Sequence, residues 1–156
     1  MSYDFEVRFQ GKTRQVLIEA VKACDPSLEL STWQPGSATI DKNMSCGQRI
    51  IERTLMLLVN CWLGVSTEMT SPSLGIQIAF FRSSAGLSVS FTEIPSTAKL
   101  AFDQAWRYLE VMQRTANLTV IDGQVGSVIN LQSDYEMCYR EYQHWLKQVS
   151  EIAKWQ

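Results

Sequence analysis

The single histidine, His144, limits the nucleophilic chemistry that this chain could perform. A Ser-His-Asp or Cys-His site would have to be built on this one imidazole, because both need a histidine as general base. Cys138 lies six residues earlier in a segment with helical spacing, and at about 100° per residue the two side chains point roughly 120° apart. They cannot pair within one helix, so His144 could act as general base only for another Cys or Ser that the fold brings close. A surface or partly packed histidine is the favoured interpretation.

Metal and cofactor sites have little support in the sequence. Glu141 and His144 match the Glu-x-x-His pattern of di-iron helix bundles, but the second copy of that pattern would have to come from a homodimer. Zinc sites need three or four closely spaced Cys or His ligands, and Cys24, Cys46 and Cys61 are widely separated. Neither a phosphate-binding glycine loop nor a nucleophile elbow occurs. We therefore predict no metal, no cofactor and no catalytic residue.

Carboxylates are the remaining side chains on which a small enzyme could be built. Two carboxyl groups with different pKa values can act as general acid and general base where they converge in a cleft. The candidates are Glu93, Asp103, Asp122 and Asp134. Their convergence in the fold would favour a carboxylate-based enzyme over a noncatalytic protein.

Aromatic side chains are abundant, with five Trp, five Tyr and six Phe. Tyr135, Tyr139, Tyr142 and Trp145 fall in one segment with helical spacing, and packing of that helix onto the fold is the simpler interpretation. The alternative is a partner-binding surface, because Tyr and Trp are the usual anchors of protein interfaces. Trp33, next to a predicted turn, is harder to assign to a core and is a second candidate for partner contact.

The spacing of apolar residues predicts the order β-α-β-α-ββ-α-ββ-α. Hairpins dominate this order, so we expect an α+β fold with a mainly antiparallel sheet covered by amphipathic helices. The predicted strands are 3–9, 28–33, 75–82, 86–93, 118–122 and 127–131, with a short further segment at 38–40, and the predicted helices are 12–24, 47–63, 95–115 and 133–155.

Three connections carry further predictions. Residues 64–75 hold three Ser, two Thr and one Pro and resemble a loop, whose twelve residues are long enough to suggest a functional role. Ser83–Gly86 is predicted as the turn of the first hairpin. Ser133 and Glu136 form a capping-box pattern that predicts the start of the last helix.

The length and the charge of the chain exclude several classes of protein. A chain of 156 residues is sufficient for a single domain, 1–156, with a substantial core. Its 14 basic and 16 acidic residues give a net charge of −2, which argues against general nucleic-acid binding and against an acidic mimic of nucleic acid. The longest apolar stretch, residues 55–65, is about half of the ~20 residues that a membrane span needs, and no export signal is visible. We expect a soluble cytoplasmic protein with reduced cysteines.

The segment Asp122-Gly-Gln-Val-Gly126 has the composition of a tight turn, because Asp-Gly starts turns and glycine tolerates positive φ. With the flanking elements, residues 75–131 resemble a strand–strand–helix–strand–strand arrangement of many small bacterial proteins of unknown function. Some of those proteins accompany secreted toxins and are similar to immunity proteins. The commoner form of the turn is Asp-Pro-Gln-Thr-Gly, from which Gly123 and Val125 depart. The resemblance transfers no catalytic residue.

The favoured interpretation is a noncatalytic protein-binding module, most specifically a bacterial immunity protein that occludes the active site of a cognate toxin. We expect a monomer or small homo-oligomer, with neither nucleic acid nor a membrane as partner. The candidate contact residues are Trp33, Asp122, Gln124, Tyr139, Tyr142 and Trp145. A carboxylate-based enzyme and a structural or assembly subunit are the alternatives.

Overall fold

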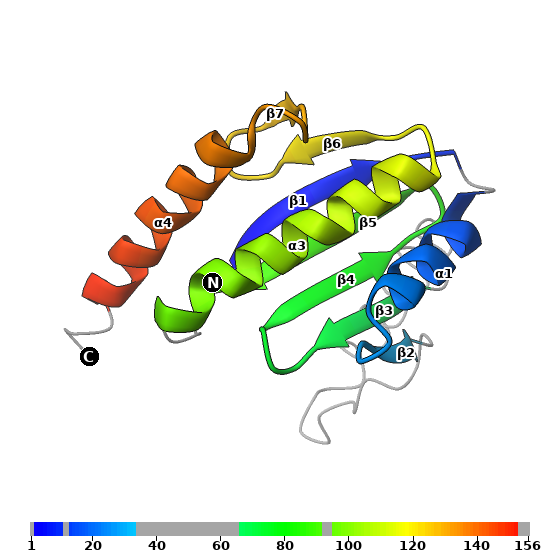
Figure 1. The fold of residues 1–156 in the computed structure, drawn as a ribbon, viewed down its shortest axis with the longest axis horizontal. Helices are drawn as coiled ribbons and strands as arrows, with labels where there is room; N and C mark the ends of the chain where they lie inside the picture. The colour runs from blue at the N-terminus through cyan, green and yellow to red at the C-terminus, as the bar shows by residue number, and fades with distance from the viewer. Residues whose placement is uncertain (1, 11–12, 34–65, 92–94, 153–156) are drawn as a thin grey trace, which may run out of the picture.

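The computed structural model describes residues 2–10, 13–33, 66–91 and 95–152, which form one seven-stranded sheet and three helices (Figure 1). The strands are β1 (Ser2–Arg8), β2 (Glu29–Trp33), β3 (Ser66–Ser71), β4 (Ile76–Phe80), β5 (Ser84–Ser90), β6 (Thr119–Asp122) and β7 (Ser127–Ile129). The helices are α1 (Arg14–Cys24), α3 (Pro95–Thr115) and α4 (Tyr135–Ile152). Neighbouring strands are antiparallel throughout, in the order β2-β3-β4-β5-β1-β6-β7. The predicted α+β class is confirmed.

One face of the sheet carries the core. In β1, Tyr3, Phe5 and Val7 are buried and alternate with more exposed polar residues, as the two-residue period of a strand requires. The neighbouring β5 places Leu87 beside Phe5 and Val89 beside Tyr3, and both are fully buried. Figure 1 shows α3 lying along β1 and β5, with α1 beside it and α4 next to the β6–β7 hairpin.

The predicted loop over residues 64–75 is wrong, because Ser66–Ser71 is strand β3, paired with β2 on one side and β4 on the other. Its Ser and Thr residues are polar, yet Thr favours extended backbone and the one large apolar residue, Met69, is fully buried. The turn follows the strand: the Leu74 N–H donates to the Ser71 carbonyl at 3.2 Å, and Gly75 has a φ of 61°. Half of this segment, residues 66–71, is therefore part of the sheet and not a contact loop.

The turn between β4 and β5 comes earlier than predicted. The Phe81 N–H donates to the Ser84 carbonyl at 2.8 Å, so residues 82–83 form the tip. Gly86, which was expected to end the turn, lies inside β5 opposite Ala79. A Cβ at Gly86 would meet nothing within 4 Å, so neither a turn nor a close contact requires glycine there.

The predicted helix 95–115 is confirmed at both ends, whereas α4 begins at Tyr135, one residue later than the capping pattern suggests. The Cys138 N–H donates to the Asp134 carbonyl at 3.0 Å, which makes Asp134 the residue before the first turn. The short segment 38–40 and the predicted helix 47–63 lie outside the described residues.

Cys24 and Cys138 are free thiols, and the other two cysteines lie outside the described ranges. Within those ranges, none of the helices combines the length and the apolar character that crossing a membrane requires.

Candidate partner-binding site

The Asp122 carboxylate is the centre of the region where β1, the β6–β7 hairpin and α4 meet. It is completely buried. The Tyr3 hydroxyl donates to Oδ2 at 2.5 Å, and the backbone N–H groups of Gln124 and Val125 donate to Oδ1 at 2.8 and 3.1 Å. The carboxylate therefore closes the hairpin turn and ties it to β1. Burial and the hydrogen bond to Asp122 raise the pKa of Tyr3 far above its usual range.

Glycine is required at two positions of this turn for different physical reasons. Gly126 has a φ of 71°, which L residues with a side chain rarely adopt, and its N–H donates to the Asp122 carbonyl at 2.7 Å. Gly123 lies against β1: its N–H donates to the Asp4 carbonyl at 2.8 Å, and an added Cβ would be 2.8 Å from that oxygen. A proline at position 123, as in the commoner Asp-Pro-Gln-Thr-Gly form, would lose this donor.

Helix α4 is attached to the same centre by Cys138 and Tyr142, both fully buried. The Cys138 thiol lies beside Asp122; burial, followed by this carboxylate, raises its pKa to about 12. The Tyr142 ring meets Tyr3 edge-on at 5.8 Å and stacks on Phe91 at 5.6 Å. These contacts hold one side of α4 to β1 and to the residue that follows β5.

A second set of contacts joins α4 to α3. The Asp103 carboxylate accepts the Tyr135 hydroxyl and pairs with the Lys99 ammonium at 2.7 Å. Lys99 also lies over the Tyr139 ring, 5.6 Å from its centroid. Burial and the bond to Asp103 raise the pKa of Tyr135 to about 12. This contact between α3 and α4 is accessible to solvent, because the side chains of Lys99 and Asp103 are both at least 40% exposed.

The structure gathers five of the six predicted contact residues in this region but divides them by burial. Asp122 and Tyr142 are fully buried, so they shape the surface and do not touch a partner directly. Gln124 and Tyr139 are half-buried, and Trp145 is 37% exposed. The sixth residue, Trp33, ends β2 at the opposite edge of the sheet, and its side chain is outside the described part.

The described carboxylates proposed for catalysis each bind their own neighbours. Asp122 closes the hairpin turn and Asp103 joins α3 to α4, as above. Asp134 accepts the Asn130 N–H at 2.8 Å and the Ser133 hydroxyl at 2.8 Å. Glu93 lies outside the described residues. A carboxylate-based enzyme needs two carboxyl groups that converge in one cleft. The three described aspartates do not show this arrangement.

His144 is exposed on the outer side of α4. Its Nε2 is 2.8 Å from the Gln148 side-chain nitrogen, and its ring lies 6.3 Å from that of Trp145. In the ranges that the structure describes, no group of three or more His, Cys, Asp or Glu side chains is placed to hold a metal ion.

Exposed apolar side chains reveal a signal that the sequence analysis missed. Among the described residues the large exposed ones are Val16, Leu30, Leu100, Val125, Val128, Met137 and Trp145. The last four belong to the C-terminal corner, which we define as the β6–β7 hairpin (residues 119–129) together with α4. Val128 is the most exposed of all, at 68%. Figure 1 shows the hairpin beside α4, at the end of the sheet away from β2.

Comparison of the chain with models of protein families, with curated proteins and with solved structures finds no match in any of the three.

Proposed function

We propose that the chain is a noncatalytic protein-binding module that contacts its partner through the C-terminal corner. The observation that carries this proposal is the placement of four of the seven exposed large hydrophobic side chains on the β6–β7 hairpin and α4. Single exposed apolar residues are ordinary on protein surfaces, whereas a group of them is typical of an interaction site.

The buried network beneath the corner supports the same proposal. Asp122 fixes the hairpin turn through two backbone N–H groups and fastens it to Tyr3, so Val125 is presented on a rigid turn. A surface that is already ordered loses less conformational entropy on binding than a flexible loop does. The corner is thus suited to recognition by shape.

The partner class is proposed from the resemblance of residues 75–131 to toxin-associated bacterial proteins. We infer that the chain acts as an immunity protein that occludes the active site of a cognate toxin. Trp145 and Tyr139 are the aromatic residues available as anchors, and the net charge of −2 favours contacts that depend on packing more than on charge.

The test is recovery of the tagged chain from the cells that produce it, followed by identification of the proteins that co-purify. A co-purifying protein that arrests growth when expressed alone, and no longer does so when the chain is co-expressed, supports the proposal. Trp145→Ala and Val128→Ser should lower the recovery of that protein at least about tenfold, as loss of an interface anchor does.

Matched controls are Val16→Ala and Leu30→Ala, which shorten similarly exposed side chains on α1 and β2. Both should retain the partner, and circular dichroism should show all four variants folded. Equal recovery with every variant would place the contact elsewhere, and a partner without toxicity would contradict the immunity role. A large ring or filament in light scattering would favour an assembly subunit.

A further inference from the structure

Two sulfur-containing side chains follow each other at the start of α4 and differ strongly in exposure. Met137 is 46% exposed, whereas Cys138 is fully buried. Consecutive residues of a helix point about 100° apart, so one side chain faces solvent while the other faces the core. A reagent dissolved in the surrounding water therefore meets the thioether of Met137 and not the thiol of Cys138.

The Cys138 thiol is also protected by its protonation state. The thiolate is the reactive form of cysteine, and burial, followed by the nearby Asp122 carboxylate, raises the pKa of Cys138 to about 12. Cys138 is therefore a neutral thiol at neutral pH. The thioether of Met137 has no proton to lose and is oxidised directly by peroxides. Of the two sulfurs, that of Met137 is the accessible and reactive one.

The other described methionines lie inside the core. Met69 belongs to β3 and Met112 to α3, and both are completely buried. The remaining methionines of the chain lie outside the described residues. Among the methionines that the structure describes, Met137 is therefore the one that a peroxide reaches without an opening of the core.

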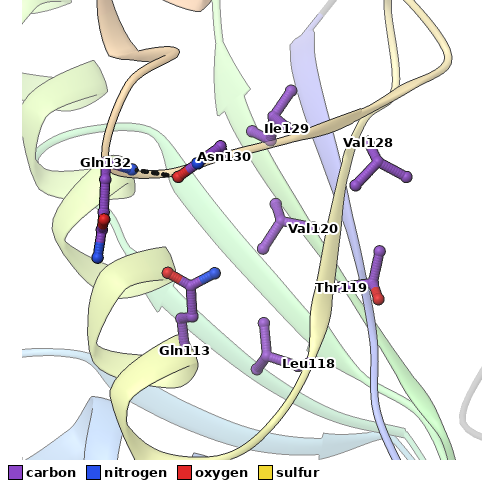
Figure 2. Close-up of a pocket in the computed structure, with 8 residues that line it drawn as sticks. All are labelled: Gln113, Leu118, Thr119, Val120, Val128, Ile129, Asn130 and Gln132. Atoms are coloured by element: carbon purple, nitrogen blue, oxygen red, sulfur yellow. Dashed lines mark hydrogen bonds between the residues drawn. The ribbon is translucent and has the colours of Figure 1, made fainter.

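A short hydrogen-bonded turn fixes the start of α4 next to the β6–β7 hairpin. The Asn130 carbonyl accepts the N–H groups of Ser133 and Asp134 at 3.1 and 2.9 Å. The Asn130 side-chain oxygen accepts the Gln132 N–H at 2.9 Å, which Figure 2 draws as a dashed line beside the pocket that both residues line. Met137 lies in the first turn of the helix that follows, so the backbone holds it in place relative to the hairpin.

We propose that Met137 is a modification site, which peroxides oxidise to methionine sulfoxide while Cys138 stays a thiol. The sulfur lone pair of Met137 attacks one peroxide oxygen, an S–O bond forms and the O–O bond breaks. The sulfur is oxidised, and the second oxygen leaves as water or as an alcohol, so the peroxide is reduced. Methionine sulfoxide reductases reverse the change, which makes it suitable as a switch.

The modification changes the surface that the proposed function uses. Met137 is one of the four exposed large hydrophobic side chains of the C-terminal corner. A sulfoxide is polar, and covering it without a new hydrogen bond costs free energy. This step rests on the proposed function: the oxidised chain binds its partner more weakly, and a bound partner shields Met137 from peroxide.

The first test is peptide mass spectrometry of the full chain after timed exposure to hydrogen peroxide at neutral pH. Met137 should be oxidised at least about tenfold faster than Met69 or Met112, because those two react only when the core opens. Cys138 should stay unmodified, and circular dichroism should show that the oxidised chain is folded. Equal rates at the three methionines, or oxidation of Cys138 before Met137, would overturn the proposal.

The second test compares recovery of the partner before and after peroxide treatment. Met137→Leu keeps an apolar side chain of similar size that cannot be oxidised, and Met112→Leu is the matched control with Met137 in place. Peroxide should lower recovery about three- to tenfold for the parent chain and for Met112→Leu, but not for Met137→Leu. An unchanged recovery by the oxidised parent, or the same loss with Met137→Leu, would overturn the link to the corner. Mass spectrometry needs no partner, so failure of the modification and failure of the proposed function are distinguishable.

Discussion

Two aspartates in different parts of the molecule accept the same pair of hydrogen bonds. In both, Oδ1 accepts the backbone N–H of the residue two positions later, at 2.8 Å for Asp122 and 3.0 Å for Asp25. In both, Oδ2 accepts a tyrosine hydroxyl at 2.5 Å, from Tyr3 and Tyr108 respectively. The first pair closes the β6–β7 turn, and the second follows the end of α1.

The two sites differ in burial and in the residue after the aspartate. Asp122 is fully buried and followed by glycine, whereas Asp25 is half-buried, is followed by Pro26 and also accepts the Ser27 hydroxyl at 2.6 Å. Water can replace lost partners at Asp25 but not at Asp122. The local motif sets the shape of each turn, and burial decides how strongly the whole fold depends on it.

The largest expected difference between the two sites comes from removing the carboxylates. Asp122→Ala leaves a buried tyrosine hydroxyl and two turn N–H groups without their acceptor, and should lower the free energy of unfolding by about 4 kcal/mol. Asp25→Ala should lower it by about 1 kcal/mol. Urea denaturation of both variants measures this difference. If both variants lose the same free energy of unfolding, burial does not decide how much each aspartate contributes to stability.

The residues that follow the aspartates give the next contrast. Gly123→Pro removes the N–H that binds Asp4 and pushes ring atoms toward a carbonyl oxygen that is already 2.8 Å from an added Cβ, so we expect a loss of about 3 kcal/mol. Pro26→Gly frees an exposed turn and should lower the free energy of unfolding by only about 0.4–1 kcal/mol, mainly through the unfolded chain. Thermal and urea unfolding of the two variants test this; a tolerated Pro at position 123 would contradict the close packing of the turn on β1.

Deletion of single hydroxyl groups should have a smaller effect. Tyr3→Phe leaves the buried Asp122 one donor short and should lower the free energy of unfolding by about 2 kcal/mol, the size expected for hydrogen bonds to charged groups. Tyr108→Phe should lower it by about 1 kcal/mol, because Asp25 keeps Ser27 and solvent as partners. If the order is reversed in urea denaturation, the pair at the half-buried Asp25 contributes more to stability than the pair at Asp122.

Both aspartate turns could be predicted from the sequence, but their tyrosine partners could not. Asp122-Gly is a local signal that gives the predicted turn, and Asp25-Pro follows directly on the predicted helix end at Cys24. Tyr3 is 119 residues from Asp122, and Tyr108 is 83 residues from Asp25. Side-chain spacing carries no information on contacts over such distances, because these depend on which strands and helices become neighbours.

The same limit explains the mixed outcome for the candidate site. Helical spacing placed Tyr139, Tyr142 and Trp145 on one helix, but only the packing of α4 on β1 shows that Tyr142 is interior and Trp145 is partly exposed. Strand β3 was missed because its polar residues resemble a loop, and its strand character depends on pairing with β2 and β4.

Acid should reveal the smallest difference, through the titration of Asp25. Hydrogen bonds from Ser27 and then from Tyr108 lower the pKa of Asp25 in the folded state below its usual value, which is about 3.9 in an unfolded chain. The unfolded state therefore binds the proton first as the pH falls. The stabilisation from Asp25 is fully present above pH ~5 and is lost as the pH falls through the folded pKa.

Asp25→Asn removes this titration while it keeps the size of the side chain. The variant should be less stable than the parent chain at pH 7, and the difference should shrink at pH 3, where the parent carboxylate is becoming protonated. Urea denaturation at the two pH values measures it, with Ser27→Ala as a second variant that should reduce the same pH dependence by removing the first of the two causes. If the difference in stability between the parent chain and the variant grows at pH 3, the folded state raises the pKa of Asp25. The charged carboxylate would then not stabilise this turn.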